Sequence, residues 1–316
     1  MKIDYPHVFQ TDIWVDFQKA LGKQVFKASG AGWSFFAVKD TAEGSKGVMH
    51  RLYVPYGPTY NDDTSKIVVL AEIDKLAKEQ KVDYIRIEPT KLGSAQDEAF
   101  DGYTKTARSF QPEYTNWVNT NRTADEILAS FSQTNRTAWR NAEKRGQTFE
   151  TVYTESEMGD FLTMMKLTAE RTGAIFRDEK YLRTLVSVLG PRGSAAVIYV
   201  IFESVRVASA LYVDDKTSGT RYYMFAGTAD AARKIGANGN LVSYMILSAA
   251  QNGIKNVDLF GVSPPGAESS HKWYGFSAFK RSYGGNDVKF AGTWEKPVNK
   301  IRYNAMKFAR SLVKKR

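Results

Sequence analysis

The chain has no cysteine and only three histidines among its 316 residues. Disulfides, thiolate metal sites and a cysteine nucleophile are therefore excluded. The histidines, His7, His50 and His271, lie far apart and lack the close spacing of a metal site. We therefore expect a protein that uses no metal and no cofactor.

Long hydrophobic runs are also missing. A membrane-spanning helix needs about 18 or more consecutive apolar residues, and no such run occurs in the sequence. The first seven residues, MKIDYPH, do not begin the apolar segment of a secretory signal. We therefore expect a cytoplasmic protein, with contact to the inner face of the membrane as an open alternative.

The composition is that of a globular protein, with 43% hydrophobic and 25% charged residues. A chain of 316 residues is long enough for two domains, each with its own core. The 44 Lys and Arg exceed the 34 Asp and Glu, which gives a formal charge of +10 that is scattered along the chain. Such a balance favours anionic or phosphorylated partners, although solubility alone also explains it.

The spacing of apolar residues predicts a mixed α/β order of helices and strands. Expected helices are 10–21, 65–80, a pair within 124–146, 155–173, 178–189 and 240–252. Expected strands are 32–38, 47–54, 82–88, 195–203, 206–213, 221–226 and 257–262. Two successive runs of strands, helix and strand indicate a structural duplication, although no clear sequence repeat accompanies it.

The segment from Val257 to Gly285 stands out because it combines a short apolar strand with aromatic and basic residues. A turn with Pro264, Pro265 and Gly266 follows the strand, and the segment closes on a pair of glycines that suits left-handed backbone. The pattern indicates a strand, a loop and a binding surface.

Several of these motifs resemble those of the Fem (FemABX) aminoacyltransferases, which add amino acids to the peptide stem of peptidoglycan precursors. The C-terminal signature is carried by VDLFGV (257–262), GFSAFKRSYGG (275–285) and KFAGTWEKPVN (289–299). Further matches in family order are QTDIWVDFQK (10–19), VPYGPTY (54–60), YIRIEP (84–89), QPEYTNWVN (111–119), NRTAWRNAEKRG (135–146) and YYMFAGTAD (222–230). The resemblance covers nearly the whole chain.

The resemblance implies two tandem GNAT-like (acyl-CoA N-acyltransferase-like) domains with mixed sheets. The first would comprise residues 1–123 and 296–316 and the second residues 124–295, with a last helix, about 298–314, returning to the first domain. Long Fem enzymes carry a helical coiled-coil arm, for which the short loops here leave no room. In this the chain is similar to compact members, which act on a soluble nucleotide-linked precursor and work as monomers.

The implied activity is transfer of an amino acid from aminoacyl-tRNA to the stem-peptide side-chain amine of UDP-MurNAc-pentapeptide or lipid II, which forms the cross-bridge. The resemblance places the precursor between the two domains. Such a transfer needs a neutral amine, a place for the developing oxyanion and grip on two anionic substrates. It needs no covalent enzyme intermediate, which suits a chain without cysteine.

The catalytic candidates are Lys280, Phe279 and Glu88. Lys280, beside Phe279 on a loop, could offer its ammonium to the carbonyl oxygen, and the resemblance places this Phe-Lys pair in the catalytic channel. From the residues alone, a solvated lysine in a basic surface segment is the favoured interpretation, and the resemblance reverses that preference. Glu88, at the end of a strand, could orient or deprotonate the acceptor amine, or instead pair with Arg86 or Lys91.

Candidates for binding the precursor lie on the first helix. Lys19 approximately matches the basic residue that holds precursor phosphates in compact Fem proteins, although Gln18 could fill the aligned position instead. Trp14, on the same helix, is a further candidate for contact with the substrate. A surface charge without a partner is the alternative for Lys19.

Three residues of a later strand are also candidates. Arg221 opens this strand, and its guanidinium suits phosphate geometry, although it could equally be a surface charge. Tyr222 and Tyr223 follow it and point to opposite faces of the strand, so at most one of them faces a ligand.

Binding of the tRNA acceptor end calls for cations and aromatic rings. The C-terminal segment offers Lys272, Trp273, Tyr274 and Arg281. The basic helix face offers Arg136, Arg140, Lys144 and Arg145, which a solvated helix face also explains.

Two other functions stay open from the sequence. An acyl-CoA-dependent N-acyltransferase would bind CoA phosphates at the loop from Arg233 to Gly239, just before a helix; in Fem proteins this loop does not serve CoA. A non-catalytic module that binds RNA or the precursor is the third possibility.

Overall fold

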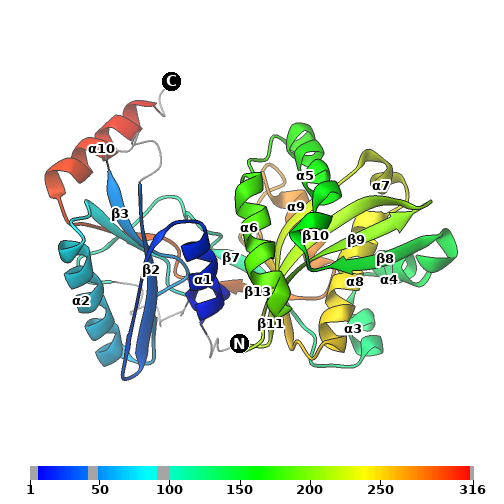
Figure 1. Ribbon diagram of the computed structural model, residues 1–316, viewed down its shortest axis with the longest axis horizontal. Helices are drawn as coiled ribbons and strands as arrows, with labels where there is room; N and C mark the ends of the chain where they lie inside the picture. The colour runs from blue at the N-terminus through cyan, green and yellow to red at the C-terminus, as the bar shows by residue number, and fades with distance from the viewer. Residues whose placement is uncertain (1–5, 42–48, 91–99, 314–316) are drawn as a thin grey trace. The chain divides into compact units, whose positions relative to one another are not determined.

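The computed structural model describes residues 6–41, 49–90 and 100–313. It divides into two compact units, unit 1 (Met1–Glu113 with Lys289–Arg316) and unit 2 (Tyr114–Val288) (Figure 1). The sequence interpretation placed the limits after residues 123 and 295. The structure places the two boundaries several residues earlier, because of strand pairing. β7 (Tyr114–Asn119) pairs with a strand of unit 2, and β14 (Trp294–Pro297) pairs with a strand of unit 1.

Unit 1 is built on one mixed sheet with the strand order β1-β2-β3-β5-β14-β6. Its strands are β1 (Gln24–Gly30), β2 (Trp33–Thr41), β3 (His50–Val54), β5 (Tyr84–Ile87), β14 and β6 (Thr104–Lys105), and β4 (Thr59–Tyr60) pairs with β2. β1, β2 and β3 form an antiparallel meander, which confirms the expected antiparallel pair. After helix α2 (Asp63–Glu79), the chain returns as β5, parallel to β3.

The two faces of this sheet differ in character. On one face Leu52, Val54, Ile85 and Ile87 join the apolar residues of α2 in a hydrophobic core. The other face carries alternate residues of the same strands, many of them charged. Helix α10 (Lys300–Val313) packs in unit 1 through Tyr303 and Met306, which cluster with Met49 and Tyr84. The 3-10 turn η1 (Val8–Gln10) and helix α1 (Asp12–Ala20) complete the unit.

Unit 2 repeats this topology with the strand order β13-β7-β12-β11-β10-β9-β8. Its remaining strands are β8 (Gln147–Val152), β9 (Ala195–Phe202), β10 (Val205–Asp215), β11 (Thr220–Thr228), β12 (Asn256–Gly261) and β13 (Asn286–Lys289). β8 to β11 form an antiparallel meander, and β12 returns parallel to β11 after helix α8 (Ala237–Gln251). Each unit thus has a meander followed by a strand-helix-strand crossover, which confirms the expected duplication.

The other helices of unit 2 are α3 (Ala124–Ser130), α4 (Gln133–Arg140), α5 (Gly159–Thr172), α6 (Glu179–Leu189), α7 (Asp230–Lys234) and α9 (Tyr274–Arg281), with 3-10 turns η2 (Glu143–Arg145), η3 (Glu155–Glu157) and η4 (Gly190–Arg192). The loop expected after β12 is present over residues 262–273, but the segment after it, which was expected to hold Lys280 on a loop, forms α9. Several strands were also not predicted, namely β1, β7, β8, β13, β14 and the two-residue β4 and β6, and neither was the short helix α7. β1 is largely exposed and lacks a continuous apolar signal.

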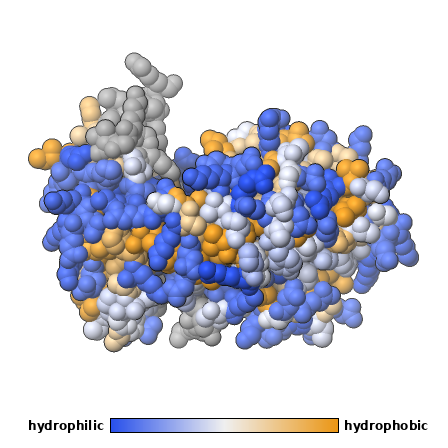
Figure 2. Space-filling model, viewed as in Figure 1, coloured by the Kyte–Doolittle hydropathy of each residue, from blue (hydrophilic) through white to orange (hydrophobic). Residues whose placement is uncertain are grey.

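The surface fits the charged composition. Hydrophilic residues cover most of the face shown in Figure 2, with hydrophobic residues scattered among them, as is normal for the surface of a folded protein. Of the helices in the described part of the chain, none has both the length and the apolar character needed to cross a membrane.

The two glycines that close the C-terminal motif play different roles. Gly284 has a φ of +72°, in the left-handed region, as expected. Gly285 is needed for close approach instead, since a Cβ there would lie 2.2 Å from Oδ1 of Asn116. The pair therefore fixes the passage from α9 to β13 by two distinct requirements.

We expect Gly284→Ala to destabilise unit 2. A Cβ at Gly284 would lie 2.2 Å from the backbone oxygen of Ser130, and left-handed backbone alone costs a residue with a Cβ roughly 1 kcal/mol or more. Gly266→Ala is the matched control, because Gly266 has a φ of +75° but open space around the added Cβ. Urea unfolding should show a larger loss of stability for Gly284→Ala. Equal losses would mean that the backbone of Ser130 yields without strain.

Candidate active site in unit 2

The site lies where two parallel strands of unit 2 stop pairing. β11 and β12 pair only from Thr220 to Tyr222 and from Asn256 to Asp258. Both strands continue beyond this point, β11 to Thr228 and β12 to Gly261. The ends of the two strands therefore diverge, and groups on β11, β12 and α9 can converge there.

Lys280 is buried at this point, with its side chain in the last turn of α9. Nζ donates a hydrogen bond to the carbonyl oxygen of Gly261 at 3.0 Å. The ring centroid of Phe276 lies 4.0 Å from Nζ and that of Tyr223 5.7 Å. Lys280 is therefore not the solvated lysine that its basic neighbours indicate, and it lies on a helix rather than on a loop.

Burial lowers the pKa of Lys280 to about 7, and the negative charge of Asp258 opposes this change. Asp258 is itself buried and accepts hydrogen bonds from the hydroxyl of Thr115 and from the backbone N–H of Phe260, the latter at 2.7 Å. Burial raises the pKa of Asp258 to about 6. Near neutral pH the site thus holds a carboxylate and a lysine of which both the charged and the neutral form are populated.

The aromatic neighbour of Lys280 is Phe276 and not Phe279, which corrects the sequence interpretation. Adjacent residues of a helix point in different directions, whereas residues four apart share a face. Phe279 packs against the core of unit 2 and lies edge-on to Tyr283, with 5.5 Å between the ring centroids. The spacing of four residues in the sequence could have identified Phe276.

Of the two tyrosines on β11, Tyr223 has its ring near Lys280, while Tyr222 is also buried and follows the alternation to the other face of the strand. This agrees with the expectation that at most one of them faces a ligand. The hydroxyl pKa of Tyr223 is raised by burial, so that this residue stays neutral at physiological pH.

Arg221 is buried and paired inside unit 2, which corrects its expected role in binding phosphate. Its side chain is 1% exposed and makes a two-pronged ion pair with Asp214, with both N–O distances 2.8 Å. It also donates to Oγ of Ser248 at 2.9 Å and to the carbonyl oxygen of Met245 at 3.1 Å. Its guanidinium lies 3.7 Å from the ring centroid of Tyr212. Arg221 is a core residue of unit 2.

Among the candidates on α1, Trp14 is also a core residue. It stacks on Phe9 with 4.0 Å between the ring centroids, and it is buried in unit 1, so it offers no face to a substrate. Lys19 is exposed in the last turn of the helix, whereas Gln18 is buried. Of this pair, Lys19 is the residue that a phosphate could reach.

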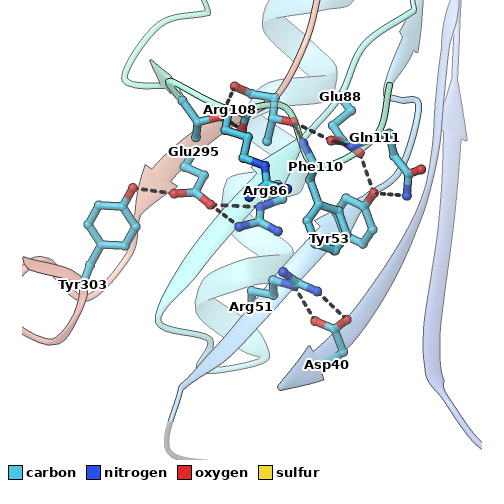
Figure 3. A network of polar contacts seen from close by, with 12 residues as sticks. Asp40, Arg51, Tyr53, Arg86, Glu88, Arg108, Phe110, Gln111, Glu295 and Tyr303 are labelled. Carbon is cyan, nitrogen blue, oxygen red and sulfur yellow. Dashed lines mark hydrogen bonds and ion pairs between the residues drawn. The ribbon is translucent and has the colours of Figure 1, made fainter. Parts of the chain in front are cut away.

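Glu88 lies in unit 1 within a buried polar network (Figure 3). Oε2 accepts from the hydroxyl of Tyr53 at 2.5 Å, and Oε1 accepts from the backbone N–H of Gln111 at 2.8 Å and from the hydroxyl of Thr293 at 2.5 Å. Burial raises the pKa of Glu88, and these hydrogen bonds oppose the rise. The carboxylate joins three segments that are far apart in the sequence.

Glu88 is buried and does not form the surface ion pair with Arg86 that the sequence left open. Arg86 binds Glu295, with a shortest N–O distance of 2.6 Å, and Glu295 also accepts from the hydroxyl of Tyr303 on α10 (Figure 3). Lys91 lies outside the described residues. In the described ranges, no group of three or more His, Cys, Asp or Glu side chains is placed to hold a metal ion.

The residues expected to contact tRNA fall into two groups. Lys272 is exposed with its Nζ 5.1 Å from the ring centroid of Trp273, and Arg140 and Lys144 are exposed on α4 and η2. Arg281 is engaged within the protein, since it pairs with Asp287 at 2.7 Å and donates to the carbonyl oxygen of Ser263 at 2.6 Å.

Comparison with known sequences finds a family model and a curated relative. The model of the FemAB family matches residues 97–204 and 200–311. The Lipid II:glycine glycyltransferase of Staphylococcus epidermidis is 27% identical over 169 residues, which are 49% of this chain and 40% of that protein. The chain therefore spans less than half the length of this curated relative.

Among solved structures, the crystal structure of FemX superposes with a TM-score of 0.82 at 18% identity, over 95% of this chain and 94% of that one. A tandem GNAT protein from the clavulanic acid biosynthesis pathway gives a TM-score of 0.55 at 12% identity, over 87% and 83% of the two chains. These likenesses concern the fold, and they confirm the expected pair of GNAT-like domains.

Proposed function

The chain belongs to the FemAB family, and on this basis we propose that it is an aminoacyltransferase of peptidoglycan synthesis. It transfers an amino acid from aminoacyl-tRNA to the stem-peptide side-chain amine of UDP-MurNAc-pentapeptide or lipid II and so builds the cross-bridge. Relatives named Lipid II:glycine glycyltransferase support this proposal. The observation that carries it is the buried Lys280 ammonium at the point where β11 and β12 diverge.

The proposed reaction forms one bond and breaks one. The acceptor nitrogen attacks the ester carbonyl of the aminoacyl-tRNA, the C–N bond forms, and the C–O bond to the ribose breaks. The amine loses a proton and the ribose oxygen gains one. Lys280 donates a hydrogen bond to the oxygen that becomes negative in between, and such donors act most strongly where water is excluded. Lys280 is buried, with the half-exposed ring of Phe276 and the buried ring of Tyr223 near its Nζ.

The other roles are proposed with this reaction. Exposed Lys19 binds precursor phosphate, and Lys272 and Trp273, with Arg140 and Lys144, contact the tRNA end. We assign Glu88 to holding its network in place rather than to proton transfer, because its oxygens already accept three hydrogen bonds. The protein acts as a monomer in the cytoplasm and meets the inner face of the membrane when the acceptor is lipid-linked.

A direct assay tests the proposal and its alternatives together. The purified protein is incubated with mixed aminoacyl-tRNAs and either a nucleotide-linked or a lipid-linked pentapeptide precursor. The masses of the products are then measured by mass spectrometry. We expect a precursor heavier by one amino-acid residue, and only with charged tRNA. A product formed from acyl-CoA instead would favour the N-acyltransferase. Binding of tRNA or precursor without turnover would favour a non-catalytic module.

The pH dependence of stability reports on Lys280 independently of any assay. Its pKa falls from 10.5 in the unfolded chain to about 7 in the folded protein. Between these two pH values the unfolded chain binds more protons than the folded one, so this group makes stability rise with pH. The limiting slope is roughly 1.4 kcal/mol per pH unit. Below this window the contribution is a constant penalty.

We therefore expect the stability of the wild type relative to Lys280→Met to increase between about pH 7 and about pH 9. Methionine keeps the length of the side chain and carries no proton, so the difference between the two proteins isolates Lys280. Urea unfolding of both at each pH measures it. A difference that stays constant with pH would show that Lys280 titrates like an exposed lysine.

A further inference from the structure

We infer that Asp258 is a positioning residue of the Lys280 site, which fixes the bulge in β12 and supplies the counter-charge of the ammonium. The catalytic consequence rests on the proposed function, whereas the geometry does not. Asp258 is 1% exposed and lies on β12, two residues before Phe260. Its carboxylate is shielded from solvent and contacts no reacting atom in the proposed reaction, so it acts through its neighbours.

The bulge is visible in the pairing of β12 with β7. Asp258 lies opposite Trp117 and Gly261 lies opposite Thr115, so three steps on β12 match two on β7. One extra residue of this kind bends a strand and redirects the groups after it. The redirected group here is the carbonyl of Gly261, which receives the hydrogen bond from Lys280.

The bulge needs support because Phe260 has a φ of +62°. Left-handed backbone is unfavourable for a residue with a side chain, by roughly 1–2 kcal/mol. The carboxylate of Asp258 accepts the N–H of Phe260 at 2.7 Å, a short-range bond that favours such a turn. The hydroxyl of Thr115 donates to the same oxygen from β7 and ties the carboxylate to the neighbouring strand.

The charge of Asp258 is the second part of its role. Nζ of Lys280 lies beside the carbonyl of Gly261, three residues after Asp258 on β12, and near the rings of Phe276 and Tyr223. Of the titratable groups, Asp258 from β12 acts on the charge of Lys280, and Tyr223 from β11 has its ring near Nζ. Tyr223 stays neutral. Burial without a negative charge favours the neutral amine, which is a poorer donor to an oxyanion. Asp258 therefore keeps more of Lys280 in the ammonium form.

The test is an NMR titration of Lys280 in the full chain labelled with carbon-13 at lysine Cε, with the signal assigned by its absence in Lys280→Met. Asp258→Asn keeps the shape and an acceptor oxygen and removes the charge. We expect it to lower the pKa of Lys280 by roughly 1 unit or more. Asp287→Asn is the control, because Asp287 is a carboxylate on β13 of the same unit that pairs with Arg281 and not with Lys280. It should leave the pKa of Lys280 unchanged.

Transfer assays on the same variants provide the second readout. With a wild-type pKa of about 7, a pKa lower by 1 unit should slow transfer by Asp258→Asn about fivefold at pH 7 and by up to about tenfold at higher pH. The rate should recover towards that of the wild type as the pH is lowered, because the ammonium form is then restored. A structural defect would not be relieved by acid. A Lys280 pKa that is unchanged in Asp258→Asn would overturn the inference.

If Asp258→Asn does not fold, Thr115→Val tests the support of the bulge instead. It removes the hydroxyl that holds the carboxylate and leaves the charge, so hydrogen exchange at the Phe260 amide should become faster. Unchanged exchange at that amide would contradict the support of the bulge. Failure of the proposed function looks different: the wild type would transfer nothing, while the shift in the Lys280 pKa would still be present.

Discussion

Replacing Lys280 with methionine should lower the rate of aminoacyl transfer by roughly 10²–10³-fold, the usual effect of removing one oxyanion donor. The side chain is buried and its Nζ is the only part that methionine cannot replace. Because methionine fills the same space, the protein should remain folded and at neutral pH should be at least as stable as the wild type. Turnover with saturating substrates and urea unfolding measure the two quantities.

Lys166→Met is the matched control for this variant. Lys166 is exposed on α5 in the same unit, and it has no part in the proposed site. It should transfer at the wild-type rate. A Lys280→Met protein that is folded and as active as Lys166→Met would show that Lys280 is a buried structural lysine and not a catalytic residue.

Replacing Arg221 should have the largest effect on stability. Arg221→Met leaves Asp214 buried without its partner, and breaking a buried ion pair in this way typically costs about 3–5 kcal/mol. The donors to Ser248 and to the carbonyl of Met245 are lost as well. Urea unfolding should therefore show a much lower midpoint than for the wild type.

The double variant Arg221→Met with Asp214→Leu is the control, because removing both charges leaves no unpaired buried charge. It should recover a large part of the lost stability. The opposite pattern, with full stability in Arg221→Met and weakened binding of the precursor, would restore the phosphate-binding role that the sequence indicated.

The order of helices and strands could be predicted because most elements show a clear apolar period. α6 and β9 are examples, with buried residues at helical spacing in one and a continuous buried run in the other. Helix α9 was not predicted because it is short, begins soon after a turn and has only two buried residues, Ser277 and Lys280. Strand β1 was not predicted for a related reason: its side chains are exposed or only partly buried, so they give no apolar pattern.

The site was predicted only in part, because burial and partners are set by the tertiary structure. Lys280 was found through its motif, but nothing local indicates that its ammonium is enclosed. Arg221 was misjudged, although its partner Asp214 lies only seven residues earlier across the turn between β10 and β11, and the hairpin register pairs them directly. The hydrogen bond from Thr293 to Glu88 joins residues 205 apart in the sequence, which no local pattern can indicate.

The most direct test of the proposed reaction locates the new bond. The precursor product formed by the wild type from aminoacyl-tRNA is fragmented by tandem mass spectrometry, beside a reaction with Lys280→Met. We expect one added amino-acid residue, linked as an amide to the stem-peptide side-chain amine, in the wild type and far less of it in the variant. No added mass with either precursor, or a residue attached to another group, would contradict the proposed function.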